Sequence, residues 1–463
     1  MSVAWRLWRT ASGAVMWAAL ALSGVAVAAD AVETALGNGM RVIVKSDHRA
    51  PVVVSMVWYK VGSIDEMTGA TGIAHVLEHM MFKGTHSVPN GTFSRLIAAA
   101  GGRDNAFTSK DYTGYIQTLH KSQLELSLRL EADRMVNLVL SPEEFAKELK
   151  VVMEERRWRT DDRPRSLVYE QLMASAYVAH PYRNPIIGWM TDLENLRVEQ
   201  AREFYKRWYA PNNAILVVVG DVRPEEVFAL AEKHFGAIPG KALPERPLRD
   251  DPPQLGPKRL VVRAQAELPY MVMGYHVPAL RDPEREWEPF ALEMLANVLD
   301  SGDASRLPQR LVRGERLAHS AGAGYAGIGR GPGMFYLSGV PTPGRTVAEV
   351  EAALRREVKQ IAEEGVSQDE LKRIKAQAIA AHVYERDSMF FQAQQIGTLE
   401  TAGLSHRTVG LYLEKLRAVT AEQVQQVARA YFIDDRLTVA TLDPQPLDGK
   451  RPAAPPAGLR HAP

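Results

Sequence analysis

The chain has 463 residues, of which 46% are hydrophobic and 24% charged, so it can form two or three soluble domains with buried cores. Its 56 Lys and Arg residues nearly cancel its 55 Asp and Glu residues, which argues against a nucleic-acid-binding protein and against an acidic disordered chain. There is no cysteine, which excludes thiolate metal sites, cysteine nucleophiles and disulfide bonds.

The N-terminus has the pattern of a cleaved secretory signal. Arg6 and Arg9 precede an uncharged apolar run, residues 14–27, which ends in small residues before Asp30. This pattern predicts a signal peptide over residues 1–29 and export across the inner membrane to the periplasm. The alternative is an uncleaved membrane anchor, but the run is shorter than the ~20 apolar residues that a span needs. No later segment is predicted to cross a membrane.

Strand patterns open the mature chain and helical patterns follow. Residues 40–44 alternate between apolar and polar side chains, and residues 51–58 are rich in β-branched side chains, so both are predicted strands. Helical periodicity dominates residues 71–160, and the apolar run at residues 214–219 predicts a buried strand.

Two proline-rich segments interrupt this order. Residues 239–258 contain six prolines with charged residues between them and no apolar periodicity, which predicts an extended linker. Residues 444–463 are also proline-rich and are predicted to form a disordered tail.

The two sides of the linker resemble each other. Residues 198–219 and residues 421–442 share a helix–turn–strand order at a constant offset and without a gap. Chance similarity between amphipathic helices is the alternative, but the shared order favours duplication. The predicted fold is α+β, with two homologous α/β domains over residues 30–238 and 259–443. Each domain is expected to pack its helices on one face of a largely antiparallel sheet.

A cluster of titratable side chains lies on one predicted helix. Residues 71–85 have helical periodicity with Thr71 as the expected N-cap, and His75 and His79 are one turn apart. Two imidazoles in this arrangement can bind one zinc ion, and Glu78 on a neighbouring face can reach a water molecule at the metal without binding the metal. The alternative is a solvated helix face that happens to carry two histidines.

A third protein ligand is expected because catalytic zinc sites use three protein ligands and one open position. Residues 141–155 predict an amphipathic helix that begins with a capping-box pattern, and Glu148 and Glu155 lie along its apolar stripe. Carboxylates on an inward face are costly unless they are paired or bind a metal. Glu154 is about 100° around the helix from Glu155, so a single metal should bind one of the two. The alternative is that these glutamates only extend from the edge of the stripe to solvent.

These motifs resemble the pitrilysin/insulinase family, the inverzincins. His-x-x-Glu-His at residues 75–79 is the inverted form of the commoner zinc-peptidase motif, and residues 101–108, residues 180–182 and the duplication extend the resemblance over nearly all of the mature chain. The resemblance implies one zinc ion per chain. It also implies that Glu155, in Val-Val-Met-Glu-Glu, is the third ligand and that Glu148 supports the site.

The same resemblance implies a binding site for the substrate. Asn105, Ala106 and Phe107 match the family's edge strand, to which a peptide adds as an extra strand through main-chain hydrogen bonds. The alternative for Asn105 is a turn residue.

The chain departs from the family pattern in its second half. Active members use an arginine and a tyrosine from this region to polarise the substrate carbonyl, but Val312 and His319 stand at the matching positions. Arg313 and Tyr325 lie nearby but out of register. The departure predicts the metal-bearing subunit of a two-chain enzyme whose homologous partner supplies the Arg/Tyr pair. The alternative is a single chain or homodimer in which Arg313, His319 or Tyr325 replaces the pair.

The predicted function is zinc-dependent hydrolysis of peptides or unfolded segments, with Glu78 as the general base. One alternative is a non-catalytic structural or peptide-binding subunit, and another is a metal-binding protein without hydrolytic activity. The intact motif argues against the first alternative. Glu78 argues against the second because a metal-binding protein does not need a carboxylate that is not a ligand.

Overall fold

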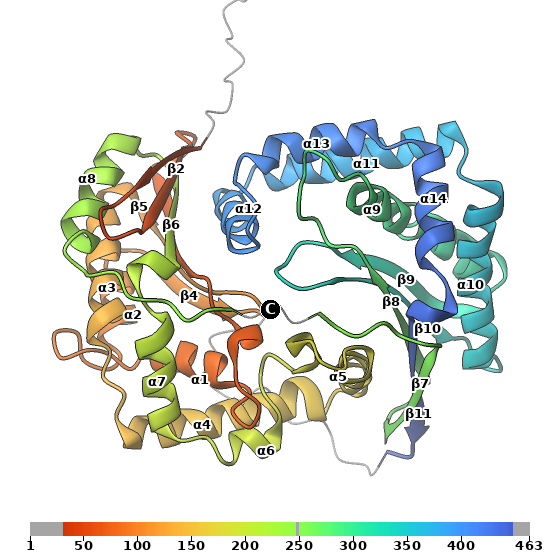
Figure 1. Cartoon of the computed structure of the whole chain (residues 1–463), viewed down its shortest axis with the longest axis horizontal. Helices are drawn as coiled ribbons and strands as arrows, with labels where there is room; N and C mark the ends of the chain where they lie inside the picture. The colour runs from red at the N-terminus through yellow and green to blue at the C-terminus, as the bar shows by residue number, and fades with distance from the viewer. Residues whose placement is uncertain (1–30, 247–249, 448–463) are drawn as a thin grey trace, which may run out of the picture. The chain divides into compact units, whose positions relative to one another are not determined.

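The computed structural model of the chain describes residues 31–246 and 250–447. The predicted signal peptide and residues 448–463 of the predicted tail lie outside these ranges. The described part forms two halves, each built on one β-sheet with several helices (Figure 1). This architecture confirms the predicted α+β class with two homologous domains.

The first half contains a six-stranded sheet in the order β1-β2-β6-β3-β5-β4. All neighbouring strands are antiparallel except β2 and β6, which are parallel, and β4 lies at one edge. The strands are β1 (Val32–Ala35), β2 (Arg41–Ser46), β3 (Val52–Tyr59), β4 (Arg103–Thr108), β5 (Thr113–His120) and β6 (Ala214–Gly220). The α-helices are α1 (Ile73–Met80), α2 (Thr92–Ala99), α3 (Leu124–Asn137), α4 (Pro142–Arg156), α5 (Pro164–Ala176), α6 (Met190–Leu193), α7 (Val198–Trp208) and α8 (Pro224–Phe235).

The second half repeats this arrangement with five strands in the order β7-β11-β8-β10-β9. Its one parallel pair, β7 and β11, corresponds to β2 and β6, which supports the predicted duplication. The strands are β7 (Lys258–Gln265), β8 (Tyr270–Val277), β9 (Ala318–Ala326), β10 (Gly333–Pro341) and β11 (Leu437–Gln445). The α-helices are α9 (Glu288–Leu299), α10 (Val347–Glu364), α11 (Gln368–Glu385), α12 (Met389–Thr401), α13 (Thr408–Ala418) and α14 (Ala421–Tyr431).

The central strand β6 is buried on both faces, which explains its continuous apolar sequence. Leu216 and Val218 face the core that the helices of the same half complete. Ile215 and Val217 face the opposite side, where they belong to a separate apolar cluster. Both faces of the first sheet are therefore covered.

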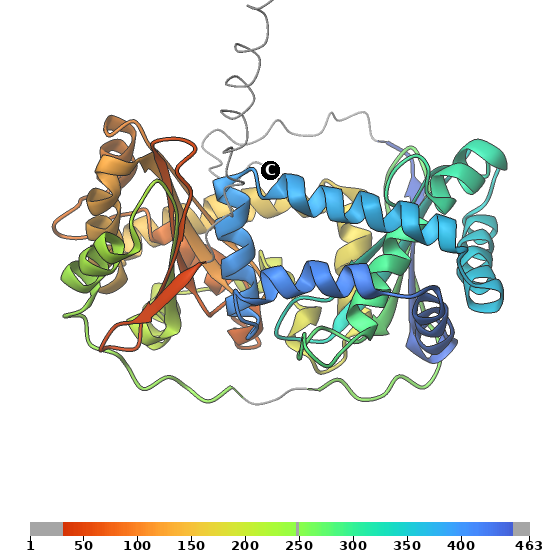
Figure 2. The ribbon, with the colours of Figure 1, turned by 90° about the horizontal axis from the view of Figure 1, so that it is seen from above.

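A helix from the other half covers that opposite face. Ala393 and Ile396 of α12 pack in the cluster with Trp58 of β3, and a Cβ atom at Gly397 would lie only 2.0 Å from the Trp58 ring. Figures 1 and 2 show α12 beside the first sheet. Close packing against the indole thus requires glycine at this position of α12.

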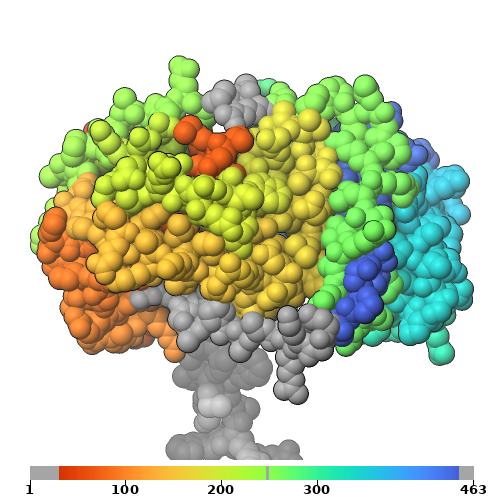
Figure 3. Space-filling view, turned by 90° about the horizontal axis from the view of Figure 1, so that it is seen from below, coloured from red at the N-terminus to blue at the C-terminus, as the bar shows by residue number. Residues whose placement is uncertain are grey.

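The second sheet receives a helix from the first half in the same way. Val168 and Leu172 of α5 pack against Val272, Ala440 and Leu442 of β8 and β11. Figure 3 shows the segment that contains α5 (yellow) beside β7 and β11 (green and blue). Each sheet thus carries helices of its own half on one face, as predicted, and one helix of the other half on the opposite face.

The strand β11 includes the first two residues of the predicted tail, Pro444 and Gln445. Pro444 cannot donate a main-chain hydrogen bond, but β11 pairs with β8 only as far as Leu442 and continues beside β7 alone. The proline therefore sits where, in the described part of the chain, one side of the strand has no partner strand. No helix in residues 31–246 and 250–447 is long and apolar enough to span a membrane.

Candidate metal centre

The motif helix α1 is buried along its whole length. It begins after Gly72, whose φ of 87° is left-handed, so Thr71 is not the N-cap that the sequence predicts. Thr71 instead donates its hydroxyl to Asp192 at 2.6 Å. The first main-chain N–H groups are bonded by Glu66, which accepts from Gly72 and Ala74 at 2.9 Å each. Burial raises the pKa of Glu66 well above its usual range, although these two bonds oppose the shift.

The structure brings the three predicted ligands together. His75 and His79 on α1 face Glu155 on α4, and their donor atoms lie within 4.8 Å of one another. Glu155 Oε2 is 3.8 Å from His75 Nε2 and 3.4 Å from His79 Nε2. Ligand atoms ~2.0–2.2 Å from a tetrahedral zinc ion are roughly 3.3–3.6 Å apart. Two imidazoles and a carboxylate at these separations therefore fit a zinc ion.

Glu154 and Glu155 differ in their exposure to solvent and in their partners. Glu155 is fully buried, whereas the side chain of Glu154 is 57% exposed and pairs with Arg157. The second carboxylate oxygen of Glu155, Oε1, lies 2.9 Å from Arg159 Nε. Arg159 belongs to a π-helical turn, Arg157–Asp161, that follows α4. Glu155 thus directs one oxygen to the histidines and the other to a guanidinium.

Glu148 contacts a predicted ligand without joining the cluster. Its Oε2 atom lies 3.2 Å from His79 Nδ1, and its Oε1 atom lies 2.5 Å from Lys83 Nζ. A carboxylate on the far nitrogen of an imidazole orients the ring and leaves the other nitrogen for the metal. This geometry agrees with the supporting role that the family resemblance implies.

Electrostatics couple these side chains strongly. Burial alone would lower the pKa of His79, but hydrogen bonds with Glu148 and Glu155 raise it to about 9. Burial alone would raise the pKa of Glu155, but His79, His75 and Arg159 lower it to about 2. These shifts favour a protonated His79 and an ionised Glu155 at neutral pH.

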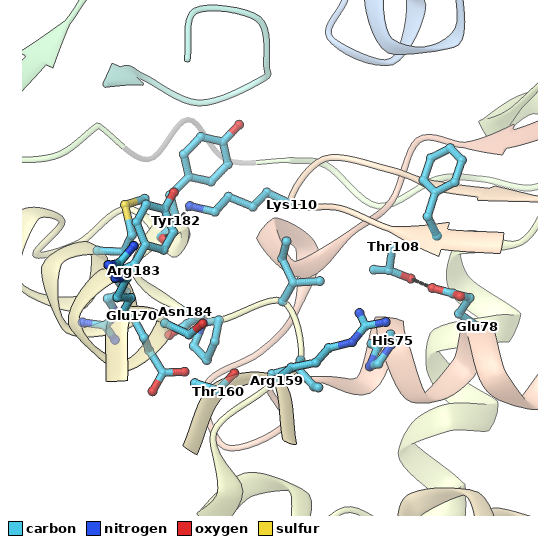
Figure 4. Close-up of a pocket in the computed structure, with 18 residues that line it drawn as sticks. His75, Glu78, Thr108, Lys110, Arg159, Thr160, Glu170, Tyr182, Arg183 and Asn184 are labelled. Atoms are coloured by element: carbon cyan, nitrogen blue, oxygen red, sulfur yellow. Dashed lines mark hydrogen bonds between the residues drawn. The ribbon is translucent and has the colours of Figure 1, made fainter. Parts of the chain in front are cut away.

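The predicted base is held by a residue that the sequence did not single out. Glu78 is 1% exposed, and its Oε2 atom accepts a hydrogen bond from Thr108 Oγ1 (Figure 4). Thr108 is the last residue of β4 and follows directly on the predicted substrate-binding residues. Its position at the end of that strand is the only sequence signal that could have indicated this contact.

The predicted substrate-binding residues lie on an edge strand. β4 pairs with β5 and, within the described residues, has no strand on its other side. Asn105 is exposed and pairs with Ile116 within the sheet, so it is a strand residue and not a turn residue. Ala106 is buried, and Phe107 is half-buried against Trp58 with ring centroids 5.1 Å apart.

A cavity of about 510 Å³ adjoins these residues. Its lining includes His75, Glu78, Phe107 and Thr108, and it extends to Tyr182 (Figure 4). The cavity therefore connects one predicted metal ligand, His75, and the predicted base with the edge strand.

The second-half residues that could replace the Arg/Tyr pair lie elsewhere. Arg313 is exposed, with Asp303 at 3.8 Å, and His319 is exposed on β9. Tyr325 donates its hydroxyl to the carbonyl of Pro278 at 2.5 Å. Within the described residues, none of these three side chains, nor Val312, lines the cavity at His75 and Glu78.

Comparison with known proteins identifies similar chains. Residues 41–189 match the family model described as insulinase (peptidase family M16), and residues 195–378 match that of the peptidase M16 inactive domain. The zinc protease PqqE of Helicobacter pylori is 33% identical over 420 residues, which cover 88% of this chain and 92% of that protein.

Solved structures agree with this similarity. The crystal structure of a protease from Helicobacter pylori has a TM-score of 0.85 and 32% identity, and the match covers 90% of this chain and all of that one. The periplasmic protease PqqL from Escherichia coli has a TM-score of 0.77 and 19% identity, over 90% of this chain and 48% of that one, which shows a shared fold.

Proposed function

The chain belongs to peptidase family M16, the insulinase family, and from this premise we propose that it is a zinc metalloendopeptidase that hydrolyses peptides or unfolded segments. The observation that carries the proposal is the convergence of His75, His79 and Glu155 beside a buried carboxylate, Glu78. The family relationship makes peptide hydrolysis the natural chemistry for this arrangement.

The proposed mechanism assigns a role to each side chain. His75, His79 and Glu155 would hold one zinc ion, which would supply Lewis-acid activation for hydrolysis. Glu78 accepts the proton of the attacking water and delivers it to the leaving amine, and Thr108 fixes the orientation of the Glu78 carboxylate. Glu148 orients His79.

The peptide is proposed to bind along β4. An extended substrate can add to the open side of this edge strand through main-chain hydrogen bonds near Asn105, Ala106 and Phe107. The cavity that begins at Phe107 and Thr108 would then receive side chains next to the scissile bond.

We further propose that a homologous partner chain completes the site. No described residue at or near the Arg/Tyr positions lines the cavity, and losing one oxyanion donor typically costs ~10²–10³ in rate. The chain alone should therefore hydrolyse peptides weakly, and a partner with the Arg/Tyr pair should restore activity in a heterodimer. Full activity of the lone chain that is abolished by Arg313→Ala or His319→Ala would instead support one chain or a homodimer.

The alternative function is a non-catalytic structural or peptide-binding subunit. Such a subunit has no need of a buried carboxylate beside the metal ligands. The burial of Glu78 and its hydrogen bond from Thr108 therefore favour the enzyme. Zinc analysis combined with a peptide-cleavage assay on the chain with its partner tests the proposal, because a non-catalytic subunit would not cleave. We also propose a periplasmic location, from the signal-like pattern of residues 1–29.

A further inference from the structure

The cavity beside the predicted catalytic residues is rich in cationic side chains. Lys110, Arg159, Arg165 and Arg183 line it, together with two carboxylates, Glu78 and Glu170. All of these residues come from the first half of the chain. They come from α1, the loop after β4, the turn after α4, α5 and the short segment that ends at Arg183.

The two carboxylates are already engaged. Glu170 accepts hydrogen bonds from both Nη atoms of Arg156, at 2.8 and 3.0 Å, and Arg156 itself does not line the cavity. Glu78 is the proposed general base and accepts a hydrogen bond from Thr108. Arg156 therefore neutralises Glu170, and the four cations that line the cavity outnumber its one remaining carboxylate, Glu78.

Three of the four cations form no ion pair in residues 31–246 and 250–447. Lys110 Nζ donates to the carbonyl of Tyr182 at 3.1 Å and lies 4.7 Å from the centre of its ring. Arg183 Nη1 donates to the carbonyl of Val178 at 2.8 Å. The guanidinium of Arg165, an exposed residue at the start of α5, lies 5.3 Å from the ring of Tyr270.

The fourth cation lies next to the metal ligands. Arg159 contacts Glu155 through Nε, and its Nη2 atom is buried and forms no hydrogen bond with any described residue. Figure 4 shows the Arg159 side chain extending toward His75, while Lys110 and Arg183 lie at the other end of the cavity with Tyr182. Donors for an anion thus stand at both ends of the cavity.

Cations without a carboxylate partner are costly in a partly enclosed cavity, because burial removes water without providing a counter-charge. Lys110 shows this cost: burial lowers the pKa of its amine to about 8, although Asp111 opposes the shift. An anionic group that entered the cavity would form charge-assisted hydrogen bonds with these donors.

We propose that this cavity binds an acidic side chain of the peptide next to the scissile bond, so that the enzyme prefers substrates with Glu or Asp at that position. The inference rests on the proposed function, because the cavity is assigned to substrate through its junction with His75, Glu78 and β4. The same donors could bind a peptide's terminal carboxylate, and the experiment below separates the two sources.

The test measures binding separately from cleavage. Zinc-loaded chain with Glu78→Gln is titrated with three labelled peptides that differ only by Glu, Gln or Lys at one internal position. The Glu peptide should bind about tenfold more tightly than the Gln peptide, and the Lys peptide most weakly. The preference should remain when the peptide ends in a carboxamide. Equal binding of the three peptides, weakened for all of them by the carboxamide, would show that the terminal carboxylate is the ligand and would overturn the proposal.

Variants connect the preference to the cavity. Lys110→Gln and Arg165→Gln should each reduce the preference for Glu, and Arg165→Glu should shift it toward the Lys peptide. Arg165 is exposed, so its variants should fold even if Lys110→Gln does not. Arg285→Gln is the matched control because the Arg285 side chain is 89% exposed and does not line the cavity. An unchanged preference in the folded Arg165 variants would overturn the proposal.

Cleavage by the chain with unaltered Glu78, together with its partner, separates this inference from the proposed function. Equal cleavage of all three peptides would overturn the acidic preference and leave the peptidase assignment intact. Cleavage of none of them, together with preferential binding of the Glu peptide, would overturn the peptidase assignment and support the cavity as a carboxylate-binding site.

Discussion

The His75, His79 and Glu155 cluster can be compared with a second cluster formed by Glu33, Glu400 and His406. In both, potential ligand atoms lie within 4.8 Å of one another. In the second cluster, Arg41 contacts both carboxylates, with Nε 2.6 Å from Glu33 and Nη1 bonded to Glu400. His406 is bonded to the same Glu400 through Nδ1 and its main-chain N–H, at 2.8 and 2.7 Å.

The difference lies in where the counter-charge is placed. Arg41 neutralises both carboxylates of the second cluster and joins β2 to α12. The second cluster is therefore an ion-pair network that links the two halves. In the first cluster, among residues 31–246 and 250–447, the only cationic side chain at Glu155 besides the histidines is Arg159, and it contacts Oε1 while Oε2 faces both imidazoles. The position of the nearest cation, and not the ligand types alone, therefore distinguishes the predicted metal site from the ion-pair network.

The largest expected effect comes from removing one histidine of each cluster. His79→Ala should reduce zinc affinity by more than the ~10–100-fold that loss of a supporting contact costs, and peptide hydrolysis should disappear with the metal. His406→Ala should leave the zinc content at about one ion per chain and lower the free energy of unfolding by about 1–3 kcal/mol, because Glu400 loses its buried hydrogen bond with the imidazole. Metal analysis and denaturant unfolding measure both effects. Loss of zinc in His406→Ala but not in His79→Ala would show that the second cluster, and not the first, binds the metal.

The next largest effect concerns the base. Glu78→Gln preserves the shape of the side chain but removes its basicity, so activity should fall by at least ~10² while zinc is retained. Glu154→Gln is the matched control, because Glu154 is exposed and directed away from the cluster. Activity and zinc content are measured on the same preparations. Parallel loss of metal and activity in Glu78→Gln would indicate that Glu78 is a ligand.

A smaller effect is expected at Thr108. Thr108→Val keeps the branched shape but removes the hydroxyl that donates to Glu78, so kcat should fall about tenfold with zinc content unchanged. Thr108→Ser, which keeps the donor, should recover most of the activity. Equal activity of the Val and Ser variants would show that the hydrogen bond does not position the base.

The smallest expected effect is the release of a proton when zinc binds. The pKa of His79 is raised to about 9 in the zinc-free chain, so this histidine is protonated at pH 7, whereas zinc binds the neutral ring. Zinc binding at pH 7 should therefore release about one proton, and apparent affinity should rise with pH until about pH 9. Calorimetric titrations in buffers of different ionisation enthalpy measure the release. Binding heats that do not depend on the buffer would contradict the protonated His79.

The sequence indicated the motif helix and the duplication because both depend on local patterns. It did not separate Glu154 from Glu155 without the family resemblance, because the two differ in exposure only once α4 packs against α1. The roles of these residues as ligands stay predictions, although the structure brings His75, His79 and Glu155 together.

Other features depend on contacts between distant segments. The bond from Thr108 to Glu78 joins a strand end to a helix, and the N–H groups at the start of α1 are bonded by Glu66 and not by the adjacent threonine. The sequences of α5 and α12 do not say which sheet each helix covers. These contacts become visible only in the assembled fold.

The most direct test of the account is the position of the metal. Crystals of the zinc-loaded chain, measured on both sides of the zinc absorption edge, should show one anomalous peak per chain. The peak should lie ~2.0–2.2 Å from ligand atoms of His75, His79 and Glu155. A peak at Glu154, or a peak beside Glu33, Glu400 and His406 with none between α1 and α4, would contradict the account.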